Sequence, residues 1–383
     1  MDFELGESHR ELRDVARAWV DKEVVPHATA WDRAEAVDRA IVGKLGEMGF
    51  LGIEIPEEYG GSGGDALAYC LLLEELGRGD SAVRGIVSVS LGLVAKSIKS
   101  YGSEEQKRAW LPRLCAGQAL GCFALTEPGT GSDAANLTTR AVRDGDDWLL
   151  SGTKIFITNG TWADIAIVFA RTGGPGPKGV TAFLVPTDTP GFTRTEIKGK
   201  LGLRGQATAE LVLGQVRVPD SARLGEEGKG FRIAMGALDK GRMGVAAGCV
   251  GVARACLEAS VRYAQEREQF GKPIASYQLV QELLADIAVE VDAARLLAWR
   301  VADLVDRGKP FGTEASVAKL FASEAAVKAA NNAIQVFGGY GYIDEYPVSK
   351  YLRDARVLTL YEGTSQIQKL LIGRALTGVN AIA

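Results

Sequence analysis

The sequence has few of the residues on which disulfide frameworks, zinc sites and histidine-based catalysis depend. Its 383 residues include five cysteines and two histidines. The cysteines are scattered and odd in number, so we expect small core residues rather than a disulfide framework. His9 and His27 lie apart from any cysteine or carboxylate cluster with metal-like spacing, which argues against a metal site or a catalytic triad. The cysteines are Cys70, Cys115, Cys122, Cys249 and Cys256.

An excess of positive charge and long apolar runs are also missing. The chain carries 44 lysines and arginines against 48 aspartates and glutamates, a net charge of −4, which argues against a nucleic-acid-binding surface. No uninterrupted apolar run approaches the roughly 18 residues of a membrane span. The acidic start at residues 1–7 lacks the basic and apolar segments of a signal or transit peptide. We therefore expect a cytoplasmic protein that binds neither nucleic acid nor a membrane.

The composition and the first region of the chain are typical of a large globular protein. Apolar residues make up 46% and charged residues 24% of a chain that exceeds the usual size of a single core. Residues 1–121 carry apolar positions three and four apart, as at Leu12, Val15, Ala16 and Trp19. This spacing predicts a first domain built of helices.

Two further domains are expected, at residues 122–230 and 231–383. The first has short apolar runs separated by turns, which predicts strands. The second has Ala-rich amphipathic stretches, which predicts helices. The expected strands include residues 148–150, 165–170, 181–185 and 210–213, and the expected helices cover 242–266, 276–307 and 313–336. A helical, a strand-rich and a second helical region make an α+β fold.

The segment from Leu360 to Gln366 carries the clearest candidate for catalysis. Glu362 places a carboxylate beside Gly363, whose missing Cβ lets a ligand approach the backbone closely. Thr364 and Gln366 can hydrogen-bond to a ligand alongside. Glu362 is therefore the candidate for proton abstraction, and the alternative from the residues alone is a solvated glutamate before a turn.

Two upstream segments suit a planar cofactor. Residues 123–133 run from an apolar entry into a Pro/Gly turn with hydroxyl groups on both sides, which suits a phosphate or a flavin edge. Residues 154–160 alternate before Asn-Gly, so Phe156 and Thr158 are expected on one face of a strand, against a ring and its edge. The alternatives are an ordinary hairpin turn for the first segment, and a core phenylalanine beside a solvated threonine for the second.

These three segments, together with residues 267–271 (Arg-Glu-Gln-Phe-Gly) and 335–339 (Gln-Val-Phe-Gly-Gly), resemble the acyl-CoA dehydrogenase family of flavoenzymes. The five motifs follow the family's order and come close to its spacing over nearly the whole chain. The pattern is most similar to the short-chain acyl-CoA dehydrogenases, with some features of the glutaryl-CoA branch.

The resemblance implies a fold, a cofactor and a reaction. The implied fold is an N-terminal helical domain, a middle β-barrel-like domain and a C-terminal four-helix bundle, in a homodimer or homotetramer. The implied reaction is FAD-dependent α,β-dehydrogenation of a short-chain acyl thioester, with Glu362 as the α-proton base and hydride transfer to flavin N5. The implied partners are an acyl-CoA or acyl-carrier-protein substrate, and an electron-transfer flavoprotein or oxygen as acceptor.

The resemblance also assigns roles to single residues. Phe156 stands where tryptophan is more usual, which keeps ring stacking but loses an indole N–H. Gly241 stands where the isovaleryl and long-chain branches carry the catalytic glutamate, which leaves Glu362 as the base. The residues assigned to FAD are Phe123, Leu125, Thr126, Gly131, Ser132, Phe156, Thr158, Arg267, Phe270, Gln278, Gln335, Gly338, Gly339, Thr364 and Gln366. Those from Arg267 to Gly339 would reach the FAD of a neighbouring subunit. The residues assigned to the substrate are Ser132, Asp239, Arg242, Gly363 and Arg84.

Three alternatives remain at this point. Arg84 falls where glutaryl-CoA dehydrogenases carry an arginine that binds the substrate's distal carboxylate. Related polyketide-pathway proteins also carry an arginine in this region, and they oxidise malonyl-type units on a carrier protein. The alternative that we favour is that Arg84 pairs with a protein acid or reaches solvent. For residues 239–242 the alternative is a solvated helix start. A function of another class would be a non-catalytic flavin- or thioester-binding protein.

Overall fold

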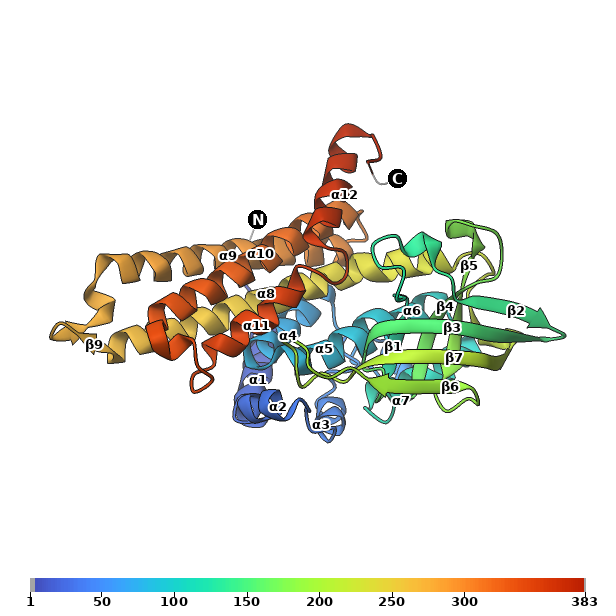
Figure 1. The fold of residues 1–383 in the computed structure, drawn as a ribbon, viewed down its shortest axis with the longest axis horizontal. Helices are drawn as coiled ribbons and strands as arrows, with labels where there is room; N and C mark the ends of the chain where they lie inside the picture. Colours follow the sequence, from blue (N-terminus) through green and yellow to red (C-terminus); the bar gives the residue numbers. More distant parts are fainter. Residues whose placement is uncertain (1–3, 382–383) are drawn as a thin grey trace.

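The computed structural model describes residues 4–381. Figure 1 shows the chain as three consecutive parts, which are the helices α1–α7, a β-sheet and the helices α8–α12. The sheet lies at one end of the molecule, and the long helices extend from it to the opposite end. This order confirms the α+β fold expected from the sequence.

Side-chain caps define the starts of the N-terminal helices. Asp65 accepts a hydrogen bond from the Ala68 N–H at the start of α4, and Asp80 accepts from the N–H groups of Ala82 and Val83 at the start of α5. Such caps satisfy amide donors that a helix start leaves free. The segment after α5 is a π-helix, a rare geometry that is frequent at functional sites. The elements are α1 (Glu7–Glu23), α2 (Ala28–Ala34), α3 (Ile41–Glu47), α4 (Ala66–Gly79), α5 (Ser81–Val89), the π-helix η2 (Ser90–Ala95), α6 (Lys96–Tyr101) and α7 (Glu104–Cys115).

The middle region is an eight-stranded sheet that encloses its own core. Its order is β6-β7-β3-β2-β4-β5-β8, and β1 pairs in parallel with β4. Apolar side chains from β1 to β7, such as Trp148 and Phe183, form one buried cluster. The strands expected from the sequence lie within β3, β4, β5 and β7. The strands are β1 (Gly121–Ala124), β2 (Arg140–Asp144), β3 (Asp147–Thr158), β4 (Ile165–Arg171), β5 (Val180–Pro186), β6 (Phe192–Glu196), β7 (Thr208–Pro219) and β8 (Arg223–Leu224).

The turn within residues 123–133 has the local bridge of a hairpin turn between Glu127 and Thr130, but it does not join two paired strands of the sheet. It follows β1, which pairs with β4 and not with the next strand along the chain. Glu127 and Thr130 close the turn locally by exchanging two backbone hydrogen bonds of 3.0 and 3.1 Å. Pro128 and Gly129 at the tip of the turn are exposed.

The longest helix, α8, connects the sheet to the C-terminal helices. It begins at Gly230 rather than near residue 242, because its first turns pack on the sheet. A Cβ on Gly230 would lie 2.5 Å from the Thr181 carbonyl carbon of β5, which leaves room only for glycine. Figure 1 shows α8 running from the sheet to the far end of the molecule. The remaining elements are α8 (Gly230–Glu266), β9 (Glu268–Gln269), β10 (Lys272–Pro273), α9 (Gln278–Asp306), α10 (Gly312–Phe337), α11 (Val348–Leu358) and α12 (Ser365–Thr377).

The interior contains the cysteines and two long apolar helical stretches. All five cysteines are buried and free, which confirms that they are core residues. The stretches Ser81–Tyr101 and Gly230–Glu266 are long and apolar enough to cross a membrane by length and composition. Their most apolar windows are 94% and 72% buried within the protein. Burial of this extent is typical of core helices, so these stretches are weak evidence for a membrane span.

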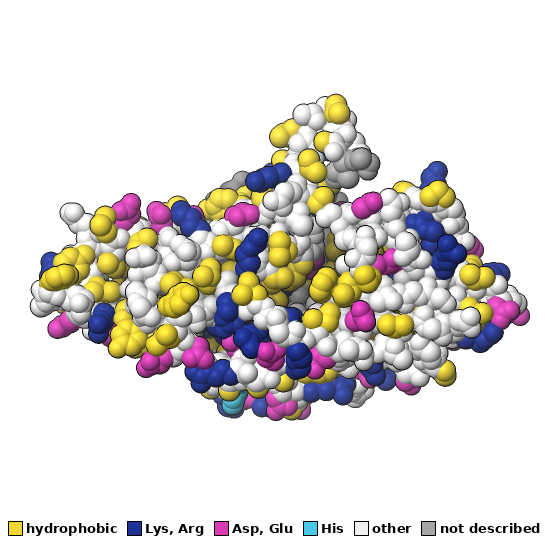
Figure 2. Space-filling view, viewed as in Figure 1, with side chains coloured by type: hydrophobic (Ala, Val, Ile, Leu, Met, Phe, Trp, Pro, Cys, Tyr) yellow, Lys and Arg dark blue, Asp and Glu magenta, His cyan; other side chains and the backbone are white. Residues whose placement is uncertain are grey.

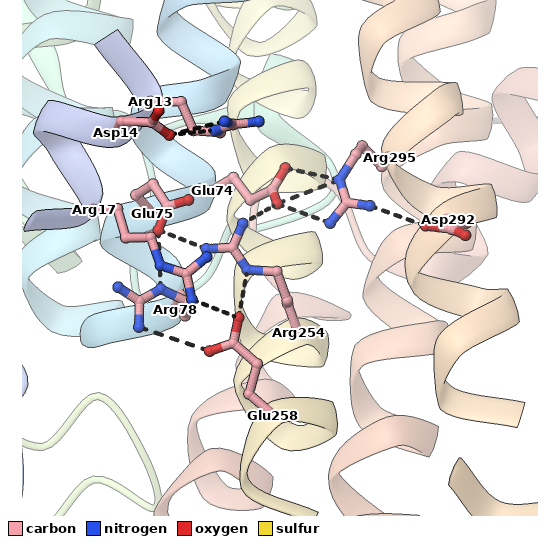
Figure 3. A network of polar contacts seen from close by, with 10 residues as sticks. All are labelled: Arg13, Asp14, Arg17, Glu74, Glu75, Arg78, Arg254, Glu258, Asp292 and Arg295. Carbon is pink, nitrogen blue, oxygen red and sulfur yellow. Dashed lines mark hydrogen bonds and ion pairs between the residues drawn. The ribbon is translucent and has the colours of Figure 1, made fainter. Parts of the chain in front are cut away.

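Buried charges join the N-terminal helices to the C-terminal ones. Arg254 of α8 donates to Glu74 and Glu75 of α4 at 2.6 and 2.5 Å. Arg78 donates to Glu75 at 2.9 Å, and Arg295 of α9 donates to Glu74 at 3.0 Å. Figure 3 shows these side chains pointing toward one another from α4, α8 and α9. Removing one carboxylate would leave buried guanidinium groups without a counter-charge.

We expect Glu75→Ala to lower the free energy of unfolding by about 3–5 kcal/mol, because Glu75 is fully buried between two arginines. The matched control is Asp292→Ala. Asp292 also pairs with an arginine, but its side chain is 76% exposed, so its loss should cost about 0–1 kcal/mol. Urea unfolding of the two variants measures both effects, and equal losses would contradict the prediction.

Candidate active site

The candidate catalytic turn joins α11 to α12 and has an unusual backbone. Glu362 and Gly363 have φ angles of 51° and 92°, in the left-handed region that a glutamate rarely adopts. A Cβ on Gly363 would lie 2.5 Å from Nε2 of Gln368, so this position also lacks space for a side chain. Thr364 caps α12 by accepting a hydrogen bond from the Ile367 N–H at 3.2 Å. Such backbone strain is typical of functional sites.

Three side chains hold the carbonyl groups of this turn. Lys319 of α10 donates from Nζ to Gly363 O at 2.8 Å. Gln368 of α12 donates from Nε2 to the carbonyl oxygens of Glu362 and Gly363, each at 3.1 Å, and Arg242 Nε donates to Glu362 O at 3.4 Å. Within residues 4–381 the Glu362 N–H makes no hydrogen bond. Sequence reasoning missed Lys319 and Gln368, because no local pattern shows which buried side chains face the turn.

The Glu362 residue is half-buried, and its carboxylate lies against α8. Its Oε2 has no hydrogen-bond partner and is inaccessible to solvent. Burial raises the pKa of Glu362 to about 7, although the charges of Arg84, Lys319 and Arg242 lower it. A Cβ on Gly241 would lie 2.2 Å from Oε2, so only glycine leaves room for the carboxylate. The alternative of a solvated glutamate is wrong, and a carboxylate with this pKa suits proton abstraction near neutral pH.

Arg84 lies inside the protein beside the turn. Only 2% of the residue is exposed. Its Nη1 donates to Ser88 Oγ at 3.1 Å, its Nη2 donates to the Tyr361 hydroxyl at 2.5 Å, and its Nε has no partner. No acid of the described residues forms an ion pair with it. The hypothesis that Arg84 pairs with a protein acid or reaches solvent is therefore wrong, because its direct partners are hydroxyls, while Glu362 acts on it only as a nearby charge.

Asp239 and Arg242 lie within α8, so the alternative of a solvated helix start is wrong. Arg242 is 6% exposed and donates to Asp239 at 2.6 Å. Burial lowers the pKa of Arg242 and raises that of Asp239. Since Arg242 also reaches the Glu362 carbonyl, this pair stands directly beside the candidate base.

A buried ion pair fixes the turn that follows β1. Lys154 Nζ is fully buried and donates to Glu127 Oε1 at 2.8 Å and to Leu125 O at 3.1 Å. Glu127 also accepts from the N–H groups of Thr138 and Thr139 at 2.6 and 2.9 Å. Burial lowers the pKa of Lys154 to about 8, whereas the Lys154 charge overcomes burial and lowers the pKa of Glu127 to about 2. The sequence pattern did not indicate this role, since an exposed lysine fits an alternating strand equally well.

The flavin residues predicted in the middle region lie in this segment and in the adjoining strand β3, where the Ile155 N–H donates to Thr126 O at 2.9 Å. Phe156 lies at a bulge of β3, has a φ of 59° and is 65% exposed, so it is not a core phenylalanine. Thr158 follows two residues later and is half-buried. Gly131 and Ser132 are exposed, and a Cβ on Gly131 would meet no atom within 4 Å. The residues at the base of the turn, which are buried or half-buried, are Phe123, Leu125 and Thr126.

Six of the other predicted flavin residues lie at the opposite end of the molecule, whereas Thr364 and the exposed Gln366 lie at the start of α12. A cavity of about 510 Å³ where α8 and α10 end is lined by Arg267, Gly338 and Gly339, among others. The Arg267 guanidinium lies 5.7 Å from the centre of the Tyr340 ring. Three predicted residues are exposed but do not line the cavity, namely Phe270, Gln278 and Gln335. The sheet lies at the other end of the molecule (Figure 1). A single chain therefore does not bring the residues in and near this cavity to the turn after β1.

Comparison with known proteins identifies the family. Models of the acyl-CoA dehydrogenase N-terminal, middle and C-terminal domains match residues 6–118, 122–216 and 228–377. The chain belongs to the acyl-CoA dehydrogenase family. Its members are flavin-dependent oxidoreductases that bind FAD.

Three relatives illustrate the similarity. The human mitochondrial short-chain specific acyl-CoA dehydrogenase is 46% identical over 370 residues, which cover 96% of this chain and 90% of that one. The structure of a Mycobacterium smegmatis glutaryl-CoA dehydrogenase in complex with FADH2 is 42% identical, with a TM-score of 0.95, over 99% of this chain and 97% of that chain. A chain in the structure described as the electron transferring flavoprotein of Acidaminococcus fermentans is 43% identical, with a TM-score of 0.97, over 98% of this chain and all of that chain. The expected resemblance to the family is therefore confirmed.

The raised pKa of Glu362 predicts a pH dependence. A carboxylate accepts a proton only when it is ionised, so the rate of flavin reduction by substrate should rise as the pH increases through about 7. Lys319→Met removes a charge that lowers this pKa, so the midpoint should move to higher pH, whereas Lys319→Arg should keep it near the wild-type value. Stopped-flow rates over a pH series measure both midpoints. A midpoint that falls in Lys319→Met would contradict the prediction.

Proposed function

We propose that this enzyme removes one hydrogen from each of the α and β carbons of a short-chain acyl thioester, with Glu362 as the base. The observation that carries the proposal is the buried Glu362 carboxylate, whose pKa burial raises to about 7 within a strained turn. The α C–H bond breaks as its proton passes to Glu362, the β hydrogen leaves with its electron pair, and the two carbons form a double bond. FAD, when bound, supplies the hydride acceptor at its N5.

The same turn supplies a hydrogen-bond donor for the thioester. Lys319 and Gln368 hold the carbonyl oxygens of the turn, while the Glu362 N–H has no partner within residues 4–381. A preorganised N–H directed at the thioester oxygen would stabilise the negative charge that develops there as the α proton leaves. The Asp239 and Arg242 pair, Ser132 and Gly363 would line the path of the thioester arm.

Two groups of residues fit FAD. Beside the turn after β1, strand β3 offers the exposed Phe156 ring and the Thr158 hydroxyl for a planar ring system and its edge. The cavity at the far end offers Arg267 beside Gly338, and a guanidinium fork suits a pyrophosphate. Because the two groups lie at opposite ends of one chain, one FAD held by both requires two subunits.

The surface supports assembly into a homodimer or homotetramer. Figure 2 shows apolar side chains gathered over the end of the molecule that carries β9, at the left. Near this end Phe270 is 95% exposed and Leu279 is 75% exposed. Apolar side chains concentrated on one surface are typical of an interface between proteins.

The acceptor that reoxidises the flavin in the cytoplasm is proposed to be an electron-transfer flavoprotein. The similarity to a chain of the Acidaminococcus fermentans structure supports this acceptor. Oxygen is the alternative. Reoxidation of the reduced enzyme that is as fast in air as with an electron-transfer flavoprotein would favour oxygen.

A second candidate is oxidation of a carboxylate-bearing acyl thioester, of the glutaryl-CoA type or a malonyl-type unit on a carrier protein. The observation that favours it is the Arg84 guanidinium, which is buried beside Glu362 with a free Nε and no protein carboxylate as partner. A ligand carboxylate would satisfy this charge.

We expect Glu362→Gln to bind FAD and substrate but to lose flavin reduction by about 10²–10⁴-fold, the usual cost of removing a general base. Glu105→Gln, in the first turn of α7, is the matched control and should reduce at the wild-type rate. Anaerobic bleaching of the flavin by an acyl thioester measures the rates. A Glu362→Gln variant with more than about a tenth of the wild-type rate would rule out this base.

Arg267→Ala should lower both FAD content and oligomer stability, since one guanidinium is proposed to join the cofactor of one subunit to the next. Flavin absorbance and size-exclusion chromatography, with and without added FAD, measure the two properties. An unchanged oligomer with full flavin content would show that Arg267 does not bridge subunits.

The substrate class can be tested at Arg84. If a distal carboxylate binds there, Arg84→Met should lower kcat/KM for glutaryl or malonyl thioesters by about ten- to a hundredfold and change butyryl thioesters little. Each acyl group is compared on CoA and on a carrier protein. A wild-type preference for butyryl that Arg84→Met leaves unchanged would discard the second candidate.

A further inference from the structure

The Tyr69 hydroxyl is a buried polar group that the reaction described above does not use. Tyr69 lies in α4, is fully buried, and its hydroxyl has no hydrogen-bond partner. The hydroxyl lies between α8 and the π-helix, where a Cβ on Gly244 would lie 3.0 Å and a Cβ on Gly92 would lie 2.3 Å from it. Lys96 Nζ, 3.9 Å from the ring centre, covers the ring rather than the hydroxyl. An unpartnered buried hydroxyl is costly, which indicates a ligand atom in the working complex.

A second unpartnered donor lies on the same face of α8. The Arg84 Nε lies 3.0 Å from the position that a Cβ on Gly248 would take. Gly244 and Gly248 are four residues apart, so their Cβ positions are about 5–6 Å from each other along the helix. The hydroxyl of Tyr69 and the Nε of Arg84 therefore both face this side of α8, one helical turn apart.

The same face of α8 also contacts Glu362, the proposed base. Gly241 lies three residues before Gly244, and its missing Cβ makes room for the Glu362 carboxylate. Burial first, and then the charges of Glu54 and Glu362, raise the pKa of Tyr69, while the Arg84 charge lowers it. The charges of Glu362 and Arg84 therefore both act on the Tyr69 hydroxyl.

We infer that Tyr69 is a specificity-determining residue whose hydroxyl, together with Arg84 Nε, donates to the distal carboxylate of a dicarboxylic acyl thioester lying along this face of α8. The inference rests on the proposed function and deepens it. Arg84 Nε can only donate and the Tyr69 hydroxyl can donate, so a ligand acceptor is the group that satisfies both. A hydrocarbon chain end would leave both groups unsatisfied. The π-helix contributes because it brings the side-chain-free Gly92 to the hydroxyl.

Equilibrium binding to the FAD-loaded enzyme tests this without turnover. Glu362→Gln serves as the background, and glutaryl-CoA and butyryl-CoA are the probes in isothermal titration calorimetry. Adding Tyr69→Phe should weaken glutaryl-CoA by about ten- to a hundredfold and leave butyryl-CoA little changed. Tyr59→Phe is the matched control, because the Tyr59 hydroxyl is bonded to Glu104 at 2.9 Å away from this face. It should leave both affinities unchanged. Gly92→Ala, which would displace the same hydroxyl, provides a second variant with the same expected selectivity.

An unchanged ratio of the two affinities in Tyr69→Phe and in Gly92→Ala would overturn the inference. Equal weakening of both thioesters would also overturn it, because that result indicates a structural role. A separate measurement, the rate of flavin reduction, tests the proposed function. Flavin reduction that survives Glu362→Gln would remove the base assignment, whereas the binding ratio would still report on Tyr69.

Discussion

The contact between the Glu362 carboxylate and the bare backbone of α8 at Gly241 is the constraint on which the site depends. A Cβ at that position would lie 2.2 Å from Oε2, so any other residue would push the carboxylate out of its place. Burial in this contact raises the pKa of Glu362 to about 7, although three cationic side chains lower it. Desolvation therefore outweighs Coulombic attraction, and the carboxylate can accept a proton near neutral pH.

The position of this contact is set by elements far apart in the sequence. Lys319 of α10 and Gln368 of α12 donate hydrogen bonds to the carbonyl oxygens of the turn. These contacts from the surrounding helices hold Glu362 at its strained φ angle. The helix α8 is in turn held between the sheet, through Gly230, and the arginine and glutamate cluster centred on Arg254. The proposed base is thus placed by a helix that is held at its first turn and again near Arg254.

Sequence reasoning found the groups whose chemistry is visible locally. The carboxylate beside glycine indicated Glu362, and the Pro/Gly turn indicated the segment after β1. It missed Lys154 and Lys319, because a lysine in an alternating strand or an Ala-rich helix has the same appearance whether it is exposed or fully buried. It was wrong about Arg84, since the expected partner of a buried arginine is an acid, whereas this one bonds Ser88 and Tyr361.

The sequence by itself determined the α+β order, the helices after residue 276, the main strands, the buried cysteines and the family. Each of these follows from periodicity or from short motifs, which act over a few residues of chain. Only the tertiary structure decided that α8 begins at Gly230, that the turn after β1 does not join paired strands of the sheet, and that Tyr69, Arg84 and Glu362 face one side of α8. These features depend on contacts between distant segments. Burial raises the pKa of Glu362 and makes an unpaired donor costly, and burial is a property of the packed molecule.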